Sequence, residues 1–135
     1  MANVLVVDDD PDLAAAVTDL LQDVGHTVRI AHDGWAGIDA LNEEALPDVV
    51  LLDLEMPFLD GPGMVYLMFV RDSGREKIPI VLVSAAVDLA AVATRVGTPY
   101  SLAKPCEGRA LLGIVERALS ERRAPHPQLE APAVP

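Results

Sequence analysis

The chain has 135 residues, the length of one ordinary domain, and its 51% hydrophobic content supplies enough apolar surface for one core. Its formal net charge of -11 argues against direct nucleic-acid binding, because a strongly acidic protein repels the phosphate backbone. There is no apolar run long enough to span a bilayer, no signal peptide and only one cysteine, so we expect a cytoplasmic protein that acts neither in a membrane nor on nucleic acid.

Strand-like and helical segments alternate along the chain. Residues 4–7 are apolar at every position, as in a strand buried on both faces, and Asp10 and Pro11 then predict the start of a helix. The same order repeats five times. We expect strands at residues 4–7, 27–31, 49–53, 80–84 and 100–103, each followed by a helix, with the helices ending near residues 24, 44, 71, 96 and 122.

Strict alternation of strand and helix predicts an α/β fold, in which right-handed crossovers build a five-stranded parallel sheet with helices on both faces. The segment after Arg123 is rich in proline and cannot continue the last helix. We therefore expect one domain at residues 1–123 and a disordered tail at residues 124–135.

Several chemically compatible side chains are expected at the carboxyl edge of this sheet, where parallel strands form the ligand crevice. They are Asp8, Asp9, Asp53, Ser84 and Lys104. Three neighbouring carboxylates repel one another unless a cation lies among them. Mg²⁺ suits such a cluster because it prefers oxygen ligands and is usually held by carboxylates together with a phosphate. The sequence therefore predicts Mg²⁺ and a phosphorylated substrate at this edge.

Asp53 is the expected nucleophile, because it stands alone at the end of the apolar strand in the middle of the chain. Lys104 offers a positive charge and Ser84 a hydroxyl, and both groups can hold phosphoryl oxygens. The expected chemistry is the transfer of a phosphoryl group to the Asp53 carboxylate.

Four motifs, taken in this order, resemble the receiver domain of two-component response regulators. They are Val-Leu-Val-Val-Asp-Asp-Asp-Pro at 4–11, Leu-Leu-Asp-Leu-Glu-Met-Pro-Phe-Leu-Asp-Gly at 51–61, Ile-Val-Leu-Val-Ser-Ala at 80–85 and Ala-Lys-Pro at 103–105. The resemblance covers about residues 3–122. It implies a doubly wound (βα)5 flavodoxin-like fold with the strand order 2-1-3-4-5.

The resemblance also implies a role for each matching residue. Asp53 would be the phosphoacceptor, Lys104 the phosphate-binding lysine and Ser84 the switch hydroxyl. Mg²⁺ would be held by Asp8, Asp9, Asp53 and the backbone carbonyl of Glu55. The phosphoryl donor would be a histidine kinase or a phosphotransfer protein. The chain would then act as a signal carrier, with its own phosphorylation and dephosphorylation chemistry, on a downstream protein partner rather than as an enzyme.

The aromatic position of the switch departs from the family pattern. The family usually has Tyr or Phe three residues before the lysine, whereas this chain has Ser101 there and Tyr100 one residue earlier. We expect Ser84, Tyr100 and Ser101 to form the switch, with the aromatic read-out altered.

The helix after Asp60 is a second departure, because residues 63–70 are apolar at every position. With Met64, Val65 and Met68 assigned to the core, the remaining side chains would form an exposed patch of the kind that marks an interface. They are Tyr66, Leu67, Phe69 and Val70. A homodimer or a contact with a protein partner through this third helix is therefore expected. The face of the fourth and fifth helices is the alternative site for a homodimer.

Three other functions fit parts of the pattern. A phosphorylation-independent pseudo-receiver would act as a binding module on the same fold. A flavin-binding protein of similar architecture is disfavoured, because three aspartates would repel the flavin phosphate. An aspartate-nucleophile phosphatase would need a general acid two residues after the nucleophile, a role that Glu55 could mimic, but the chain has no cap domain.

Overall fold

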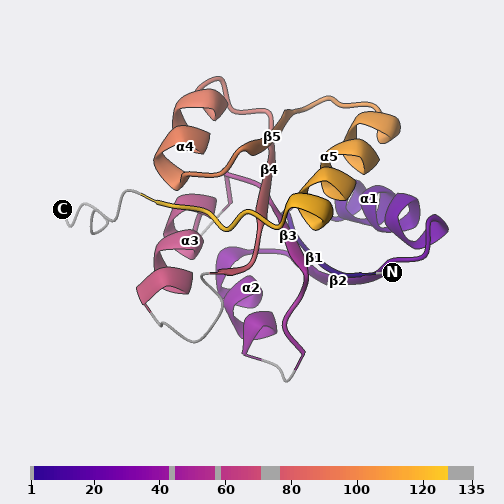
Figure 1. Cartoon of the computed structure of the whole chain (residues 1–135), viewed down its shortest axis with the longest axis horizontal. Helices are drawn as coiled ribbons and strands as arrows, with labels where there is room; N and C mark the ends of the chain where they lie inside the picture. The colour runs from indigo at the N-terminus through magenta and orange to yellow at the C-terminus, as the bar shows by residue number, and fades with distance from the viewer. Residues whose placement is uncertain (1, 43–44, 57–58, 71–76, 128–135) are drawn as a thin grey trace.

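The structure of the chain is a computed structural model, and it describes residues 2–42, 45–56, 59–70 and 77–127, apart from the side chains of residues 69 and 70. Strands and helices alternate in the predicted order (Figure 1). The elements are β1 (Asn3–Val7), α1 (Pro11–Asp23), β2 (Thr27–Ala31), α2 (Gly34–Leu41), β3 (Val49–Leu52), α3 (Gly61–Val70), β4 (Ile80–Ser84), α4 (Leu89–Val96), β5 (Tyr100–Ala103) and α5 (Gly108–Glu121). The helix ends expected near residues 44 and 71 lie outside the described residues.

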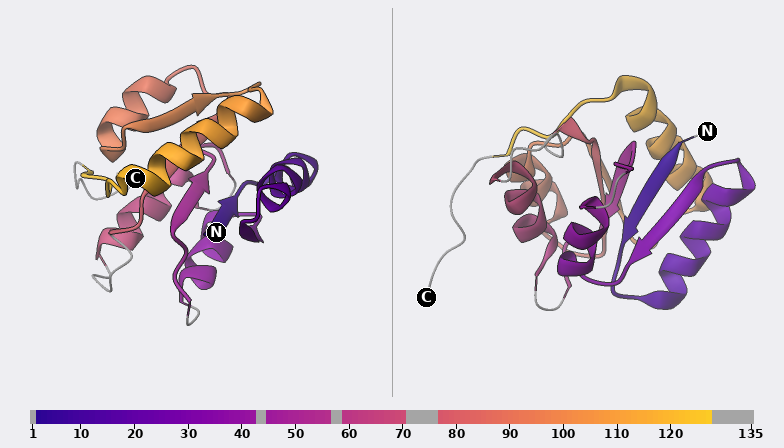
Figure 2. Two further views of the ribbon diagram at one scale, coloured as in Figure 1. Left: turned by 45° about the vertical axis from the view of Figure 1, so that its right-hand side comes forward. Right: turned by 90° about the horizontal axis from the view of Figure 1, so that it is seen from below.

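The strands form one parallel sheet in the order β2-β1-β3-β4-β5, which confirms the predicted fold class and strand order. Helices α2, α3 and α4 cover one face of the sheet, and α1 and α5 cover the other (Figure 2). Among the described residues, no helix combines the length and apolarity that a bilayer crossing requires.

Two hydrophobic cores lie on opposite faces of the sheet. On β1, Leu5 and Val7 belong to the core under α2, α3 and α4, while Val4 and Val6 belong to the core under α1 and α5. The described residues of β3 and β4 are buried on both faces as well. This double burial explains why these strands are continuous apolar runs without polar alternation.

Short polar residues start and end the helices as expected. The Asp10 carboxylate accepts hydrogen bonds from the amides of Asp12 and Leu13, so Asp10 caps α1. Asp33 caps α2 in the same way, through the amide of Ala36. Gly97 ends α4 in a left-handed conformation with a φ of 74°, which glycine adopts without a steric penalty. Asp10 and Asp33 thus begin their helices directly after β1 and β2, at the carboxyl edge of the sheet, and Gly97 lies at the opposite edge, before β5.

Helix α3 buries Met64, Val65 and Met68 in the core, as assigned from the sequence. Leu67 packs against the same core, and both Tyr66 and Leu67 are only partly exposed. The side chains of Phe69 and Val70 lie outside the described part of the chain. The apolar patch and the homodimer expected through α3 therefore stay predictions.

The chain continues beyond α5 as an ordered segment over residues 122–127, which returns along the sheet towards α4 (Figure 1). The sequence predicted a disordered tail from residue 124. Within this segment the amide of His126 donates to the Gly97 carbonyl, at the end of α4, at 3.0 Å. Residues 128–135 lie outside the described residues, and the division into a domain at 1–123 and a disordered tail at 124–135 stays a prediction.

Candidate functional site

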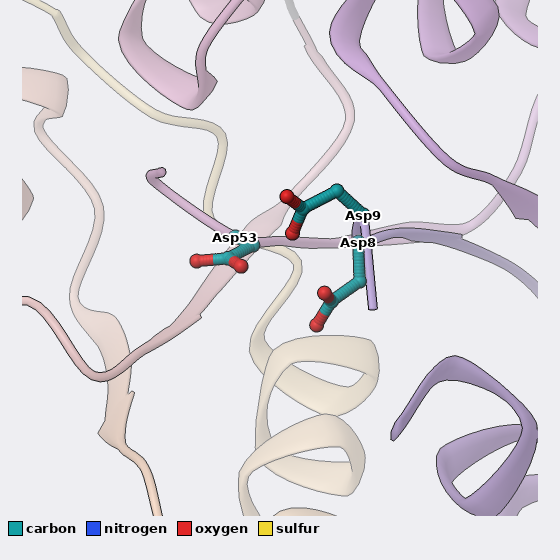
Figure 3. Close-up of side chains that lie close together, drawn as sticks. All are labelled: Asp8, Asp9 and Asp53. Atoms are coloured by element: carbon teal, nitrogen blue, oxygen red, sulfur yellow. The ribbon is translucent and has the colours of Figure 1, made fainter. Parts of the chain in front are cut away.

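Three carboxylates meet at the carboxyl edge of the sheet. β1 and β3 are neighbours in parallel register, with Val7 opposite Leu52, so the next residues, Asp8 and Asp53, emerge side by side. One carboxylate oxygen from each of Asp8, Asp9 and Asp53 lies within 4.8 Å of the others. Figure 3 shows the three side chains gathered at these strand ends. The structure thus brings together the acidic residues predicted from the sequence.

The carboxylates differ in how far they are removed from water. Asp8 and Asp53 are buried, with 7% and 8% exposure, whereas Asp9 is exposed. Backbone amides hold the two buried carboxylates in place. The amide of Asp10 donates to Asp8 Oδ1 at 2.9 Å, and the amide of Glu55 donates to Asp53 Oδ1 at 3.3 Å. Asp9 therefore forms the solvent-facing side of the cluster.

Lys104, which follows β5, closes the other side of the cluster. Its Nζ donates to Asp8 Oδ2 at 2.8 Å and to Asp53 Oδ2 at 3.3 Å. Its backbone amide donates to the Ser84 carbonyl at 3.0 Å, so the end of β4 positions the lysine. One ammonium group thus bridges the two buried carboxylates.

The two carboxylates keep Lys104 charged. Burial disfavours the charged form, but the hydrogen bond to Asp8 and the negative charges of Asp53 and Asp8 outweigh it, so the pKa of Lys104 is raised above its ordinary value. The ammonium is therefore protonated at every pH at which the protein is expected to work. It is a permanent positive charge that a phosphoryl oxygen can contact.

The donor set fits a hard divalent cation. Three carboxylates share one ammonium group, so more negative than positive charge is concentrated among the described residues of the cluster. Each carboxylate oxygen can accept about two hydrogen bonds or metal contacts, so Asp8 and Asp53 retain acceptor capacity beside their present partners. Mg²⁺ prefers such oxygen ligands. The carbonyl of Glu55, predicted as a further ligand, belongs to the loop directly after Asp53, and the Glu55 side chain is exposed.

Ser84 ends β4, and its side chain is buried with 1% exposure. Its hydroxyl oxygen accepts a hydrogen bond from the amide of Ala86 at 3.2 Å. This contact is a local turn at the strand end, of the kind that serine often makes. The structure therefore places Ser84 one strand away from Asp53, with its hydroxyl engaged by its own loop.

Tyr100 and Ser101 lie on opposite faces of β5. Tyr100 is fully buried in the core under α1 and α5. Ser101 is paired with Leu82 and therefore shares the other face with Leu82 and Ser84, the face that α4 covers. The aromatic ring is thus on the far side of the sheet from the Ser84 side chain. The predicted switch role of Tyr100 stays a prediction, but its ring does not lie on the Ser84 side.

A small apolar cavity beside the site did not emerge from sequence reasoning. Its volume is about 370 Å³, and it extends from Asp8, Asp53 and Lys104 into the space between α1 and α5. Val17 of α1, Leu111 of α5 and the exposed Cys106 are among its lining residues. Hydrophobic periodicity marks these residues as core but does not show whether their side chains fill the space between two helices.

His32 is a second neighbour that the sequence did not indicate. Its Nδ1 lies 3.2 Å from the backbone carbonyl oxygen of Asp8, and because a carbonyl only accepts, this ring nitrogen donates. β2 and β1 are adjacent, so the residue after β2 reaches the loop that carries the acidic pair. Only the strand order makes this contact predictable.

Known proteins with similar sequences are response regulators. The model of the family described as "Response regulator receiver domain" matches residues 4–116. The protein Rrf1 of Nitratidesulfovibrio vulgaris is 36% identical over 121 residues, which are 88% of this chain and 83% of Rrf1. The response regulator FleR of Pseudomonas aeruginosa is 37% identical over 118 residues, which are 86% of this chain but only 24% of FleR.

Solved structures give the same result. NtrX of Brucella abortus superposes with a TM-score of 0.79 and 30% identity over 90% of this chain and 27% of NtrX. The chemotaxis protein CheY4 of Vibrio cholerae gives a TM-score of 0.77 and 28% identity over 87% of this chain and 98% of CheY4. A CheY-like receiver protein of Methanospirillum hungatei, at 21% identity and a TM-score of 0.78 over 90% and 96% of the two chains, shares the fold. The four motifs, the strand order and these similarities agree, and the chain belongs to the family of response regulator receiver domains of two-component signalling.

Proposed function

We propose that this receiver domain accepts a phosphoryl group on Asp53 from the phosphohistidine of a histidine kinase or phosphotransfer protein. The observation that carries the proposal is the arrangement of Asp53 itself. Its carboxylate lies at the carboxyl edge of the sheet, and one of its oxygens is within 4.8 Å of an oxygen from each of Asp8 and Asp9. Lys104 Nζ contacts the Asp53 carboxylate at 3.3 Å. A nucleophile, a cation site and a fixed positive charge are thus within reach of one phosphoryl group.

The transfer is a substitution at phosphorus. An oxygen of Asp53 forms the new P–O bond while the P–N bond of the phosphohistidine breaks, and the imidazole leaves with the bonding electron pair. Asp53 becomes an acyl phosphate, which water hydrolyses to restore the carboxylate. Lys104 stabilises the charge on the phosphoryl oxygens, because its ammonium already lies beside the attacking carboxylate.

Mg²⁺ would be held by Asp8, Asp9 and Asp53, together with the backbone carbonyl of Glu55. When bound, it neutralises negative charge on the carboxylates and the phosphoryl oxygens. The residues of the chain hold the phosphorus within reach of Asp53, and Asp9, the exposed member of the cluster, lies on the side through which solvent and a donor enter.

The output of the domain would be a protein contact. The modified Asp53 offers new acceptor oxygens that favour a different arrangement of the nearby strand ends. Ser84 would be the hydroxyl that moves towards them, because it ends β4, the strand beside the one that leads into Asp53. A cytoplasmic location is consistent with this partnership. The net charge of -11 disfavours direct contact with nucleic acid.

The test is intact-mass measurement after incubation with a small acyl phosphate and Mg²⁺. We expect one phosphoryl adduct in the parent chain and in Asp39→Asn, a control that makes the same chemical change at an exposed carboxylate on α2. Asp53→Asn and removal of Mg²⁺ should each abolish the adduct. Labelling that survives Asp53→Asn would refute the assignment.

A phosphorylation-independent binding module is the second candidate. It is favoured by Tyr100, whose ring lies on the opposite face of β5 from Ser101 and Ser84. Such a module would show no adduct under any of these conditions, yet would still bind its protein partner. The parent chain therefore decides between the two candidates in a single measurement.

A further inference from the structure

The segment after α5 joins two helices that are otherwise separated by β5. Residues 122–127 leave the end of α5 and pass along the sheet to the end of α4 (Figure 1). Two backbone amides join this segment to β5 and to the end of α4. The amide of Arg123 donates to the Tyr100 hydroxyl at 3.4 Å, and the amide of His126 donates to the Gly97 carbonyl at 3.0 Å. Pro125, between them, is buried.

Tyr100 is the anchor on the α5 side. Its ring is fully buried, and its hydroxyl donates to Glu121 Oε1 at 3.0 Å while it accepts the amide of Arg123. Glu121 also accepts from Arg117 Nε at 3.2 Å, and the Arg117 guanidinium lies 5.3 Å from the centre of the Tyr100 ring. One phenol therefore connects β5, the last turn of α5 and the returning segment.

Gly97 is the anchor on the α4 side. A Cβ at this position would overlap the backbone of His126, so the two backbones pack directly against each other. Gly97 also has a positive φ, and its own amide bonds the last turn of α4. The contact is thus formed between the C-terminal stop of α4 and the returning chain, with no side chain between them.

The turn at Arg122, which starts the segment, is fixed by contacts with α5 and with the residue before β3. Arg122 adopts a left-handed conformation with a φ of 51°, which residues other than glycine and asparagine seldom occupy. Its amide donates to the Ala118 carbonyl at 2.8 Å, and its guanidinium donates to Asp48 Oδ1 at 3.2 Å. Asp48 immediately precedes β3, so the turn is tied to the amino edge of the sheet.

We propose that residues 122–127 form a latch that holds α4, β5 and α5 in the arrangement found here and opposes their rearrangement. The latch lies at the amino edge of the strands, and Asp53 at the carboxyl edge. The two edges are joined by β5, which carries Tyr100 at its first position and leads into Lys104. The regulatory part of this proposal rests on the proposed function.

Linkage then fixes the consequence. If the latch stabilises the unmodified arrangement, its removal makes phosphorylation of Asp53 more favourable, and phosphorylation weakens the latch by the same factor. Coupling between two sites in a domain typically changes affinity by a factor of about five or more. Removal of a segment that only adds stability would lower the unfolding temperature without changing the phosphorylation of Asp53.

A matched pair of substitutions in the full chain tests the latch. His126→Pro removes the amide that bonds Gly97, whereas His126→Ala keeps it and removes only an exposed side chain. We expect hydrogen exchange of the amides in α4 and β5 to be faster in His126→Pro than in His126→Ala. At a limiting concentration of acyl phosphate and Mg²⁺, the phosphorylated fraction relative to the unphosphorylated one should rise about fivefold. Tyr100→Phe, which releases the other anchor, should act in the same direction.

Equal exchange and equal phosphorylation in the two His126 variants would overturn the latch. Faster exchange with unchanged phosphorylation would overturn the regulatory part of the proposal, because the segment would then be a structural brace only. If the parent chain takes up no phosphoryl group, the proposed function fails by itself. In that case, faster exchange in His126→Pro still supports a latch between α4 and α5, and equal exchange refutes it.

Discussion

The polar groups at the two ends of β5 differ in whether they can still accept further contacts. At the carboxyl end, Lys104 bridges Asp8 and Asp53, whose oxygens retain acceptor capacity for a cation or a hydrogen-bond donor. At the amino end, the Tyr100 hydroxyl both donates and accepts a hydrogen bond and is enclosed by α5 and residues 122–127. The oxygens at the first end can accept further contacts, whereas the hydroxyl at the second end is already bonded within the protein.

β5, a strand of four residues, connects a cluster of charged groups at one end to a hydrogen-bonded phenol at the other. The charged end can change its partners at low cost, because carboxylates and an ammonium group exchange contacts without burying an unpaired atom. The phenol end cannot, because release of Tyr100 would leave its buried hydroxyl without a partner. A change at Asp53 would therefore reach the Tyr100 end only by moving β5 as a unit.

Removal of the Lys104 charge, at the carboxyl end of β5, should have the largest effect on stability. Lys104→Met leaves Asp8 and Asp53 as neighbouring buried carboxylates without their counter-charge, and we expect the free energy of unfolding to fall by about 2 kcal/mol at pH 7. Urea denaturation measures this change. Added Mg²⁺ should restore part of the loss in Lys104→Met, because a cation replaces the missing charge. Lys77→Met, at an exposed lysine, is the control and should change little.

Added side-chain volume should stabilise the domain where it enters the cavity beside Lys104, and destabilise it in the fully packed core. Val17→Ile adds a methylene group next to a cavity of about 370 Å³ and should stabilise the domain by about 0.5–1 kcal/mol. Val115→Ile makes the same change at a fully buried position of the same core that does not line the cavity, and should destabilise it by about 1 kcal/mol. Thermal unfolding of the two variants gives the signs. Stabilisation by both would mean that the core is loosely packed throughout.

Loss of the Tyr100 hydroxyl, at the amino end of β5, should destabilise the domain less than loss of the Lys104 charge. Tyr100→Phe keeps the buried ring and removes only its hydroxyl, so we expect about 1 kcal/mol of destabilisation from the lost hydrogen bonds. Tyr66→Phe on α3 is the matched control and should have a smaller effect, since Tyr66 is partly exposed. An unchanged unfolding midpoint in Tyr100→Phe would show that its hydroxyl does not fasten the segment.

The smallest effect should be a dependence on alkaline pH. Burial and the hydrogen bond to Glu121 raise the pKa of Tyr100, and the contacts with Asp8 and Asp53 raise the pKa of Lys104. The unfolded chain then loses these protons first, so stability falls as the pH rises above about 10, and neither group changes it between about pH 6 and 9. Unfolding midpoints measured from pH 9 to 11 should fall less steeply in Tyr100→Phe than in the parent chain.

Much of the site was predictable because it follows from one geometric rule. Apolar runs mark the strands, parallel strands end at a common edge, and the residues just beyond them therefore meet. Asp8, Asp53 and Lys104 were assigned on this basis, and the structure brings them together. A second rule, that successive side chains of a strand point to opposite faces, places Tyr100 and Ser101 on opposite faces of β5.

The partners of each side chain were not predictable in this way. Ser84 has a hydroxyl at the expected strand end, but its present hydrogen bond to Ala86 depends on the conformation of its loop. The cavity next to Lys104 depends on how α1 and α5 pack against each other, and the periodicity of the sequence does not reveal this packing. Proline content correctly ruled out a continued helix after Arg123, yet it carried no information about a contact with α4.

By itself, the sequence determined the α/β class, the five strand and helix pairs, the caps and the residues at the carboxyl edge, since each depends on local pattern or on the common direction of parallel strands. Only the tertiary structure decided that Tyr100 bonds Glu121 and Arg123 and that His126 bonds Gly97. These contacts join residues more than 20 positions apart through single atoms. No local propensity specifies them, because they exist only when α4, β5 and α5 are packed together.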